Sequence, residues 1–374
     1  MNAMKTKQSQ VTTPLPEKEG QGGGSVYSII IPVYNRPDEV DELLASLCMQ
    51  TSRNFDVHII EDGSDIPCKS VCDRYADRLD LNYYVKPNGG PGAARNYGAD
   101  RAEGDYFIVL DSDVVLPEGY IAAIDEELHR EPADAFGGPD RAHPDFTLVQ
   151  KAISYAMTSF FTTGGIRGGK KKLDKFYPRS FNMGVSRQLW QQLGGFRKMR
   201  FGEDIDFSIR IFKAGARCRL FPDAWVWHKR RTDFCRFFRQ VRNSGAARIN
   251  LHLLHPGSMK LVHMLPALFT LGCLVLVILF VFGMLLYFFG PDHMNQAFGF
   301  ALCELTVLLP LLYGLLIFVD SSLQNRSLWV GLLSVPAAFI QLIGYGTGFL
   351  SAAWHRLVLK QKGEGFDDNE RLYK

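Results

Sequence analysis

Residues 27–62 read YSIIIPVYNRPDEVDELLASLCMQTSRNFDVHIIED. The Ile-rich apolar run at 27–33 predicts a buried strand of a parallel sheet. A helix is expected to begin at Pro37, because proline suits the first helical turn, two acidic residues follow it, and leucines then recur on one face. A second buried strand is predicted at Phe55–Ile60, and the acidic turn EDGSD comes directly after it. The stretch therefore predicts a strand, helix, strand unit.

The same alternation continues downstream. Helices are predicted near Lys69–Tyr75 and Ala93–Ala102, and strands near Leu81–Val85 and Tyr106–Leu110. This order is typical of an α/β layered fold with a mostly parallel central sheet. In such folds ligands bind beyond the carboxyl ends of the strands, so functional residues are expected in the segments that follow strands.

Charge and cysteine usage exclude two classes of protein. The 374 residues carry a net charge of only +3, which gives no support for nucleic-acid binding, because that needs a dense basic face. The seven cysteines lack the spacing of a disulfide framework or a zinc site, which fits a reducing compartment.

Polarity divides the chain into parts. Residues 1–25 are polar and rich in Gly, Gln and Lys, and predict a disordered tail. A catalytic domain is predicted at 26–231 and an amphipathic interfacial helix region at 232–260. A transmembrane region of two to three spans is expected at 261–352, followed by a basic tail at 353–374.

Three apolar stretches, at 265–289, 298–319 and 328–350, are each long enough to cross a bilayer. Several arginines precede the first stretch and its exit loop has neither Lys nor Arg, which predicts that the catalytic part faces the cytoplasm. Three spans would place the basic tail outside, against the same rule. One stretch is therefore expected to be re-entrant or interfacial, and the third, rich in glycine, is the first candidate.

Residues 234–242, FCRFFRQVR, interleave aromatic residues with arginines. This pattern predicts a helix that lies on the membrane surface and holds the catalytic domain there. The alternative is an ordinary amphipathic helix that packs on the domain.

Two carboxylates follow the strand predicted at 106–110. Asp111 and Asp113 would lie at the carboxyl edge of the sheet, where oxygen ligands can hold Mg²⁺ or Mn²⁺ together with a diphosphate. A solvated Asp-Ser-Asp turn is the alternative. His228 follows the apolar run 224–227 and either ligates the metal or lies in the core.

Two other segments that follow strands are candidates for donor binding. Asp62 could accept hydrogen bonds from a base or a ribose, with an Asx-turn as the alternative. The loop NGGPGAARN at 88–96 resembles an anion-binding helix start, with Arg95 available to phosphates. It matches neither the P-loop nor the dinucleotide fingerprint.

The stretch GEDIDF at 202–207 predicts the start of a helix with Glu203 and Asp204 in its first turn. The apolar face of this helix is expected to pack on the core through Ile205, Ile209 and Phe212. One of the two carboxylates could act as a general base toward an acceptor hydroxyl. The alternative is that carboxylates simply favour helix starts.

Five motifs, in this order and spacing, resemble family two glycosyltransferases of the GT-A fold. The resemblance covers roughly residues 27–242, and the family often continues into membrane helices. It implies an inverting transferase of the membrane-anchored bacterial type, with a GT-A nucleotide-sugar-binding domain. The motifs are SIIIPVYNRPDEVDELLASL, VHIIEDGSD, NGGPGAARNYGADRAEGDYFIVLDSDV, FNMGVSRQLWQQLGGF and FGEDIDFSIRIFKAG.

The same resemblance implies roles for individual residues. Asp204 would be the catalytic base, and Asp113 would hold Mn²⁺ or Mg²⁺ together with Asp111 and His228. Glu203 and Asn182 would line the acceptor side. The donor nucleotide-sugar would be bound by Pro32, Tyr34, Asn35, Asp62, Arg95, Asp111 and Ser112.

The function implied is transfer of a single sugar, most readily from a UDP-sugar, to a lipid-linked or other glycan acceptor at the bacterial inner membrane. Processive synthases of the family carry a Gln-x-x-Arg-Trp motif. The comparable stretch here, Arg239 to Asn243, contains no Trp, which disfavours polymerisation. A processive polysaccharide synthase remains one alternative. A nucleotide-sugar-binding membrane protein without catalysis is the other, and the acidic residues present argue against it.

Overall fold

The computed structural model describes residues 27–143, 145–164, 176–229 and 231–360. The predicted N-terminal tail lies outside these residues, as does most of the basic C-terminal tail. We call the described residues from 27 to 254, which precede the three long apolar helices, the head. A seven-stranded sheet forms its centre, in the order β3-β2-β1-β4-β8-β6-β9. Its strands are β1 (Tyr27–Val33), β2 (Phe55–Asp62), β3 (Leu81–Lys86), β4 (Tyr106–Leu110), β6 (Ala135–Gly137), β8 (Asn182–Ser186) and β9 (Cys218–Leu220).

The first four strands form the predicted parallel unit. β1 pairs in parallel with both β2 and β4, and β2 pairs in parallel with β3. β8 then enters antiparallel to β4. β1 is covered on both faces and is apolar except for Ser28, whose hydroxyl accepts the Gly104 backbone N–H, as a buried strand of a parallel sheet is expected to be. The mostly parallel α/β sheet is confirmed.

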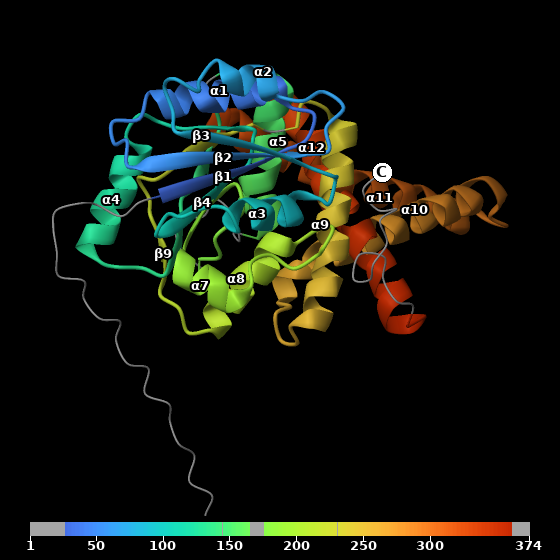
Figure 1. Cartoon of the computed structure of the whole chain (residues 1–374). Helices are drawn as coiled ribbons and strands as arrows, with labels where there is room; N and C mark the ends of the chain where they lie inside the picture. Colours follow the sequence, from blue (N-terminus) through green and yellow to red (C-terminus); the bar gives the residue numbers. More distant parts are fainter. Residues whose placement is uncertain (1–26, 144, 165–175, 230, 361–374) are drawn as a thin grey trace, which may run out of the picture.

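Two layers of helices cover the sheet (Figure 1). One core cluster joins Ile29 and Ile31 to helices on one face, and a second joins Ile30 and Ile60 to helices on the other. The first face is covered by α1 (Pro37–Cys48), α2 (Lys69–Asp73) and α4 (Tyr120–Arg130); the second by α3 (Pro91–Ala99), α7 (Arg187–Leu193) and α8 (Glu203–Lys213).

Two predictions about element detail were wrong. β2 runs on to Asp62, because Glu61 and Asp62 still pair with β3, so the acidic pair ends the strand instead of forming the turn after it. In α8, Phe207 and Ile211 join the core cluster and the predicted Ile209 is buried, while the predicted Ile205 and Phe212 are only half-buried. Pairing with neighbouring elements set both outcomes, and local pattern alone does not contain that information.

A second, three-stranded sheet stands beside the main one. Its order is β5-β10-β7, from β5 (Val114–Val115), β7 (Asp140–Arg141) and β10 (Val226–His228). β10 is antiparallel to β5, and this register sets His228 opposite Val114. Residues more than a hundred positions apart in the sequence thereby meet at the end of β4.

The remaining elements of the described residues are helices. α5 (Leu148–Thr158) and the short α6 (Phe160–Thr163) precede β8, and α9 (Phe234–Leu254) follows the small sheet. After the turn η1 (Leu261–His263) come α10 (Leu265–Phe289), α11 (His293–Asn325) and α12 (Leu328–Ala353), which ends in η2 (Trp354–Val358). Three helices, Leu265–Phe289, His293–Asn325 and Leu328–Val358, are long and apolar enough to cross a membrane. Figure 1 shows α10 and α11 projecting together away from the head.

Candidate active site

Three side chains predicted as metal ligands meet at the carboxyl end of β4. Asp111 and Asp113 directly follow the strand, and His228 ends β10 beside them. Each offers one ligand atom, and these atoms all lie within 4.8 Å of one another. Ser112, between the two carboxylates, is buried. The Lys229 backbone N–H donates to the Asp113 carbonyl oxygen at 3.0 Å, which holds the two segments in register.

Asp113 is the most buried of the three side chains. Arg36 Nη1 donates to Asp113 Oδ2 at 2.6 Å, and His228 Nε2 lies 3.3 Å from Asp113 Oδ1. Burial opposes ionisation of this carboxyl, but the nearby imidazole and guanidinium outweigh it and hold the pKa below its ordinary value. Asp113 is therefore a carboxylate at neutral pH. The sequence analysis gave Arg36 no role, although it follows the predicted donor residues directly.

The donor set at this position fits a divalent cation. Among the described residues, Asp113 Oδ1 is one of the buried oxygens that have no hydrogen-bond partner. A buried carboxylate oxygen left in this way is costly unless a cation or donor satisfies it. Mn²⁺ binds both carboxylate oxygens and imidazole nitrogens. Mg²⁺ prefers oxygen ligands, so it would be held by the two carboxylates.

Arg95 connects this cluster to the start of α8. Its guanidinium is buried, and it donates from Nη2 to Asp111 Oδ1 at 2.7 Å and from Nη1 to Glu203 Oε1 at 3.0 Å. Burial raises the pKa of Glu203, and this is only partly offset by Arg95. The sequence predicted Arg95 and Glu203 for different sides of the site, and the structure joins them by one guanidinium.

Asp204 is next to Glu203 in the sequence and forms an ion pair with a different arginine. Arg179 Nε donates to Asp204 Oδ2 at 2.6 Å, and Asp204 Oδ1 accepts the Ile205 backbone N–H at 2.8 Å. Burial opposes ionisation here too, but the charge and hydrogen bond of Arg179 lower the pKa of Asp204 below its usual range. The sequence analysis missed Arg179, because it stands in a loop without a motif.

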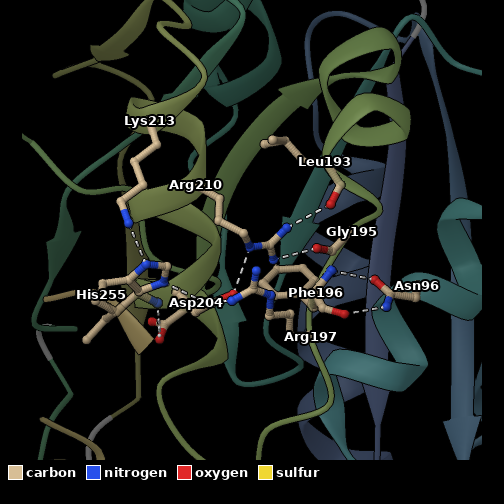
Figure 2. Close-up of polar contacts among 11 residues, drawn as sticks. Asn96, Leu193, Gly195, Phe196, Arg197, Asp204, Arg210, Lys213 and His255 are labelled. Atoms are coloured by element: carbon tan, nitrogen blue, oxygen red, sulfur yellow. Dashed lines mark hydrogen bonds and ion pairs between the residues drawn. The ribbon is translucent and has the colours of Figure 1, made fainter. Parts of the chain in front are cut away.

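Asp206, two residues further on, links the first turn of α8 to neighbouring segments. Its fully buried carboxylate accepts from Arg210 Nε at 2.8 Å and lies 2.8 Å from His255 Nε2. Figure 2 shows Arg210 also reaching the carbonyl oxygens of Leu193 and Gly195, while His255 meets Lys213. These paired buried charges attach α8 to the loop after α7 and to the end of α9.

The residues predicted for the nucleoside lie at the neighbouring strand ends. Tyr34 is 47% exposed after β1. Asn35, at φ 54°, donates its backbone N–H to Ser64 Oγ at 2.7 Å and accepts the Ile66 N–H on its side-chain oxygen at 3.0 Å. The turn after β1 is thereby tied to the loop after β2, while half-buried Pro32 lies within β1, opposite Ile60.

Asp62 is engaged with the glycine-rich loop. Its two carboxylate oxygens accept the backbone N–H groups of Gly89 at 2.9 Å and Gly90 at 2.8 Å, and Lys86 pairs with it. Asp62 therefore holds the loop that leads into α3 and Arg95. Its predicted contact to a base or ribose stays a prediction.

Asn182, which was predicted for the acceptor side, makes contacts inside the protein. Asn182 is buried, its side-chain oxygen accepts the Tyr120 hydroxyl at 2.6 Å, and its amide donates to the Ala224 carbonyl at 2.8 Å. It pairs with Leu110 inside the sheet. Both ends of the amide serve internal contacts, so the side chain has a structural role.

The chain is similar to known glycosyltransferases. Residues 28–194 match the model of the family described as Glycosyl transferase family 2. The chain is 38% identical over 97 residues to the minor teichoic acid biosynthesis protein GgaB of Bacillus subtilis, which covers 25% of this chain and 11% of that protein. It is 25% identical over 249 residues to a pre-mycofactocin glycosyltransferase of Mycobacterium tuberculosis, which covers 61% of this chain and 48% of that protein.

Among solved structures, the mannosyltransferase PcManGT of Pyrobaculum calidifontis, in complex with GDP-Man and Mn²⁺, is similar with a TM-score of 0.53 and 17% identity. The similarity covers 89% of this chain and 88% of that chain. It shows that the two proteins share the GT-A fold. The matched regions span less than half of the curated relatives, from 11% of GgaB to 48% of the mycobacterial protein.

Proposed function

Because residues 28–194 are a family 2 glycosyl transferase domain, we propose that this protein moves a single sugar, with inversion, from a nucleotide-sugar to a membrane-associated acceptor. One observation carries the proposal. The three clustered side chains Asp111, Asp113 and His228 lie one arginine away from the paired carboxylates of α8. Arg95 thus joins the proposed cation site to Glu203, the neighbour in sequence of the proposed base Asp204.

Donor binding is proposed at the carboxyl ends of β1, β2 and β4. Exposed Tyr34 supplies an aromatic surface for the nucleoside, while Asn35 and Asp62 hold the turns around it. The ion Mn²⁺ or Mg²⁺ would be held by Asp111, Asp113 and His228. When bound, the ion would offset the negative charge of the departing diphosphate. Arg95 adds a fixed positive charge beside the same oxygens.

Asp204 is the proposed general base. Its carboxylate takes the proton of the acceptor hydroxyl as the acceptor oxygen bonds to the anomeric carbon and the bond to the diphosphate breaks. The lowered pKa keeps Asp204 ionised at neutral pH, ready to accept this proton. Glu203 is occupied by Arg95 and has a raised pKa, so we assign it to positioning on the acceptor side.

The acceptor and compartment follow from the apolar helices. A head attached to helices of this kind places its site near a bilayer, so we propose a lipid-linked saccharide acceptor of the cell envelope, at the cytoplasmic face of the bacterial inner membrane. Teichoic acid synthesis by the relative GgaB supports an envelope product. A uridine nucleotide is the proposed donor, with a guanosine nucleotide next, since PcManGT is in complex with GDP-Man.

The test is release of nucleoside diphosphate by the full-length protein in detergent. UDP-, GDP- and dTDP-sugars would be offered with Mn²⁺ or Mg²⁺ and a lipid extract as acceptor. Metal-dependent release from one donor is expected, and a single added sugar should be found on the product by mass spectrometry. Donor binding without release from any of them would favour the non-catalytic binding protein, and a growing polymer would favour the processive synthase.

Replacement of Arg179 by glutamine should move the acidic limb of the kcat profile to higher pH. A base works only when ionised, and Arg179 lowers the pKa of Asp204, so removing the guanidinium raises that pKa. The displacement toward higher pH would be measured from kcat between pH 4 and 9. The surface variant Arg200→Gln serves as the control. An acidic limb that stays in place would contradict the assignment of Asp204.

A further inference from the structure

The three long helices have different surroundings. We compare the share of each helix's most apolar stretch that is buried in protein. This share is 6% for α10, 17% for α11 and 39% for α12. A helix that meets lipid on most sides leaves its apolar side chains uncovered, as α10 does. α12 is instead covered by protein along much of its surface, although its length and composition would also permit a span.

Helices of the head cover α12 along its length. α10 and α11 contact it as well: Ile317 of α11 packs on Ala338, and a Cβ on Gly346 would stand 2.0 Å from the Thr270 hydroxyl oxygen of α10. One apolar cluster joins Val330 and Ala337 of α12 to Ile153 of α5 and to Phe237 and Val241 of α9. Another cluster, toward the other end of α12, joins Phe349 to Ile249 of α9 and Ala267 of α10. Both halves of α12 therefore rest on helices of the head. Figure 1 shows α12 beside α5 and α9, at the base of the projecting α10 and α11.

Glycines bring the backbones of α9 and α12 into direct contact. A Cβ atom on Gly348 would stand 1.9 Å from the Arg242 carbonyl oxygen, and one on Gly245 would stand 2.1 Å from the Tyr345 carbonyl oxygen. A Cβ on Gly344 would meet the Val241 side chain at 2.6 Å. Small residues at such positions allow two helices to pack closely. Gly344 and Gly348, two of the glycines that made this stretch a weak span candidate in the sequence, therefore lie in the interface between α12 and α9.

The charges of α9 then decide where α12 can lie. α9 carries the exposed arginines Arg236, Arg239 and Arg242. If α12 crossed the hydrocarbon core, α9 would have to enter it too, and each arginine near the centre would be costly to bury in lipid. At the membrane surface the same arginines meet water and lipid phosphates.

α11 returns to the head after it leaves. Tyr155 of α5 donates its hydroxyl to Asp320 Oδ2 near the end of α11 at 2.6 Å. The start of α10 also lies at the head, where the Thr270 hydroxyl contacts the Leu342 carbonyl of α12 at 3.4 Å. α10 and α11 are about 38 and 50 Å long, enough to cross a hydrocarbon core of about 30 Å and come back.

We infer that the chain crosses the membrane twice, by the α10–α11 hairpin, and that α12 lies in the bilayer surface between the lipid and the head. The partner of its uncovered face is the bilayer itself. Leu328, Trp329 and Leu332 are exposed on α12, and Phe160 is exposed on the adjacent α6. Aromatic and aliphatic side chains of this kind insert into the interface. Arg356 and Lys360 then lie on the same side as the head, in agreement with the positive-inside rule.

Cysteine labelling in the full chain tests this inference. Pro291, between α10 and α11, and Lys360, after η2, are both exposed, and each would be replaced singly by cysteine. Intact and permeabilised cells would be treated with a membrane-impermeant maleimide, and modified peptides would be quantified by mass spectrometry. The native exposed Cys235 on α9 reports the side of the head in the same sample.

The thiol at position 291 is expected to react in intact cells, while the thiol at 360 reacts only after permeabilisation, together with Cys235. Thermal unfolding in detergent at the parent temperature checks that each variant is folded. Labelling at 360 on the side opposite to Cys235 would show a third crossing and overturn the inference. Labelling at 291 on the same side as Cys235 would overturn it too, because the hairpin would then not cross.

Discussion

Asp204→Asn is expected to reduce sugar transfer by about 10²- to 10⁴-fold while the affinity for the donor changes little. The amide has nearly the shape of the carboxylate and can still meet Arg179, but it cannot take a proton from the acceptor. Turnover would be measured as metal-dependent nucleoside diphosphate release at saturating acceptor, and donor affinity by calorimetry on the same preparation.

Asp100→Asn is the matched control, because Asp100 is exposed at the end of α3 and has no place in the site. It should leave both measurements unchanged. If Asp204→Asn kept its turnover, the base assignment would be wrong, and Glu203 would be the next residue to test. If donor binding fell as far as turnover, Asp204 would have a structural role instead.

Asp113→Asn is expected to weaken Mn²⁺ binding by at least about 100-fold and to remove transfer with it. The substitution replaces one carboxylate oxygen by an NH2 group and removes the negative charge that Arg36 and His228 now balance. Bound Mn²⁺ would be measured by the loss of the free-ion signal in electron paramagnetic resonance, with and without nucleoside diphosphate.

The exposed residue Asp223 provides the control for this experiment, as Asp223→Asn removes one negative charge away from the cluster. Retained Mn²⁺ affinity in Asp113→Asn would contradict the proposed metal site even if activity were lost. The binding measurement therefore separates loss of the ion from loss of catalysis for another reason.

Much of the site could be predicted because its residues follow strands. Asp111 and Asp113 come directly after an apolar run, and Asp62 ends another, so their place at one sheet edge follows from parallel topology. His228 was left open between a metal ligand and a core residue. The pairing of β10 with β5 brings it beside Asp113.

The arginines could not be assigned in the same way. Arg36 and Arg179 each meet a carboxylate far away in the sequence, and neither stands in a pattern that indicates its partner. Asn182 was assigned to the acceptor side from its motif, but its position in β8 turns both amide groups inward. An ion pair between distant segments depends on which strands pair, and local pattern does not contain that information.

By itself the sequence determined the α/β class, the parallel unit from β1 to β4, the carboxylates at its edge and the three apolar stretches, because each depends on periodicity or on residues near in the chain. Tertiary structure alone decided the pairing of Arg179 with Asp204, the buried support of α8 by His255, and the packing of α12 against α9. These are contacts between segments far apart in the sequence. A glycine-rich apolar stretch has the same composition whether it crosses a bilayer or rests on a neighbouring helix, so only the arrangement of the whole chain distinguishes the two.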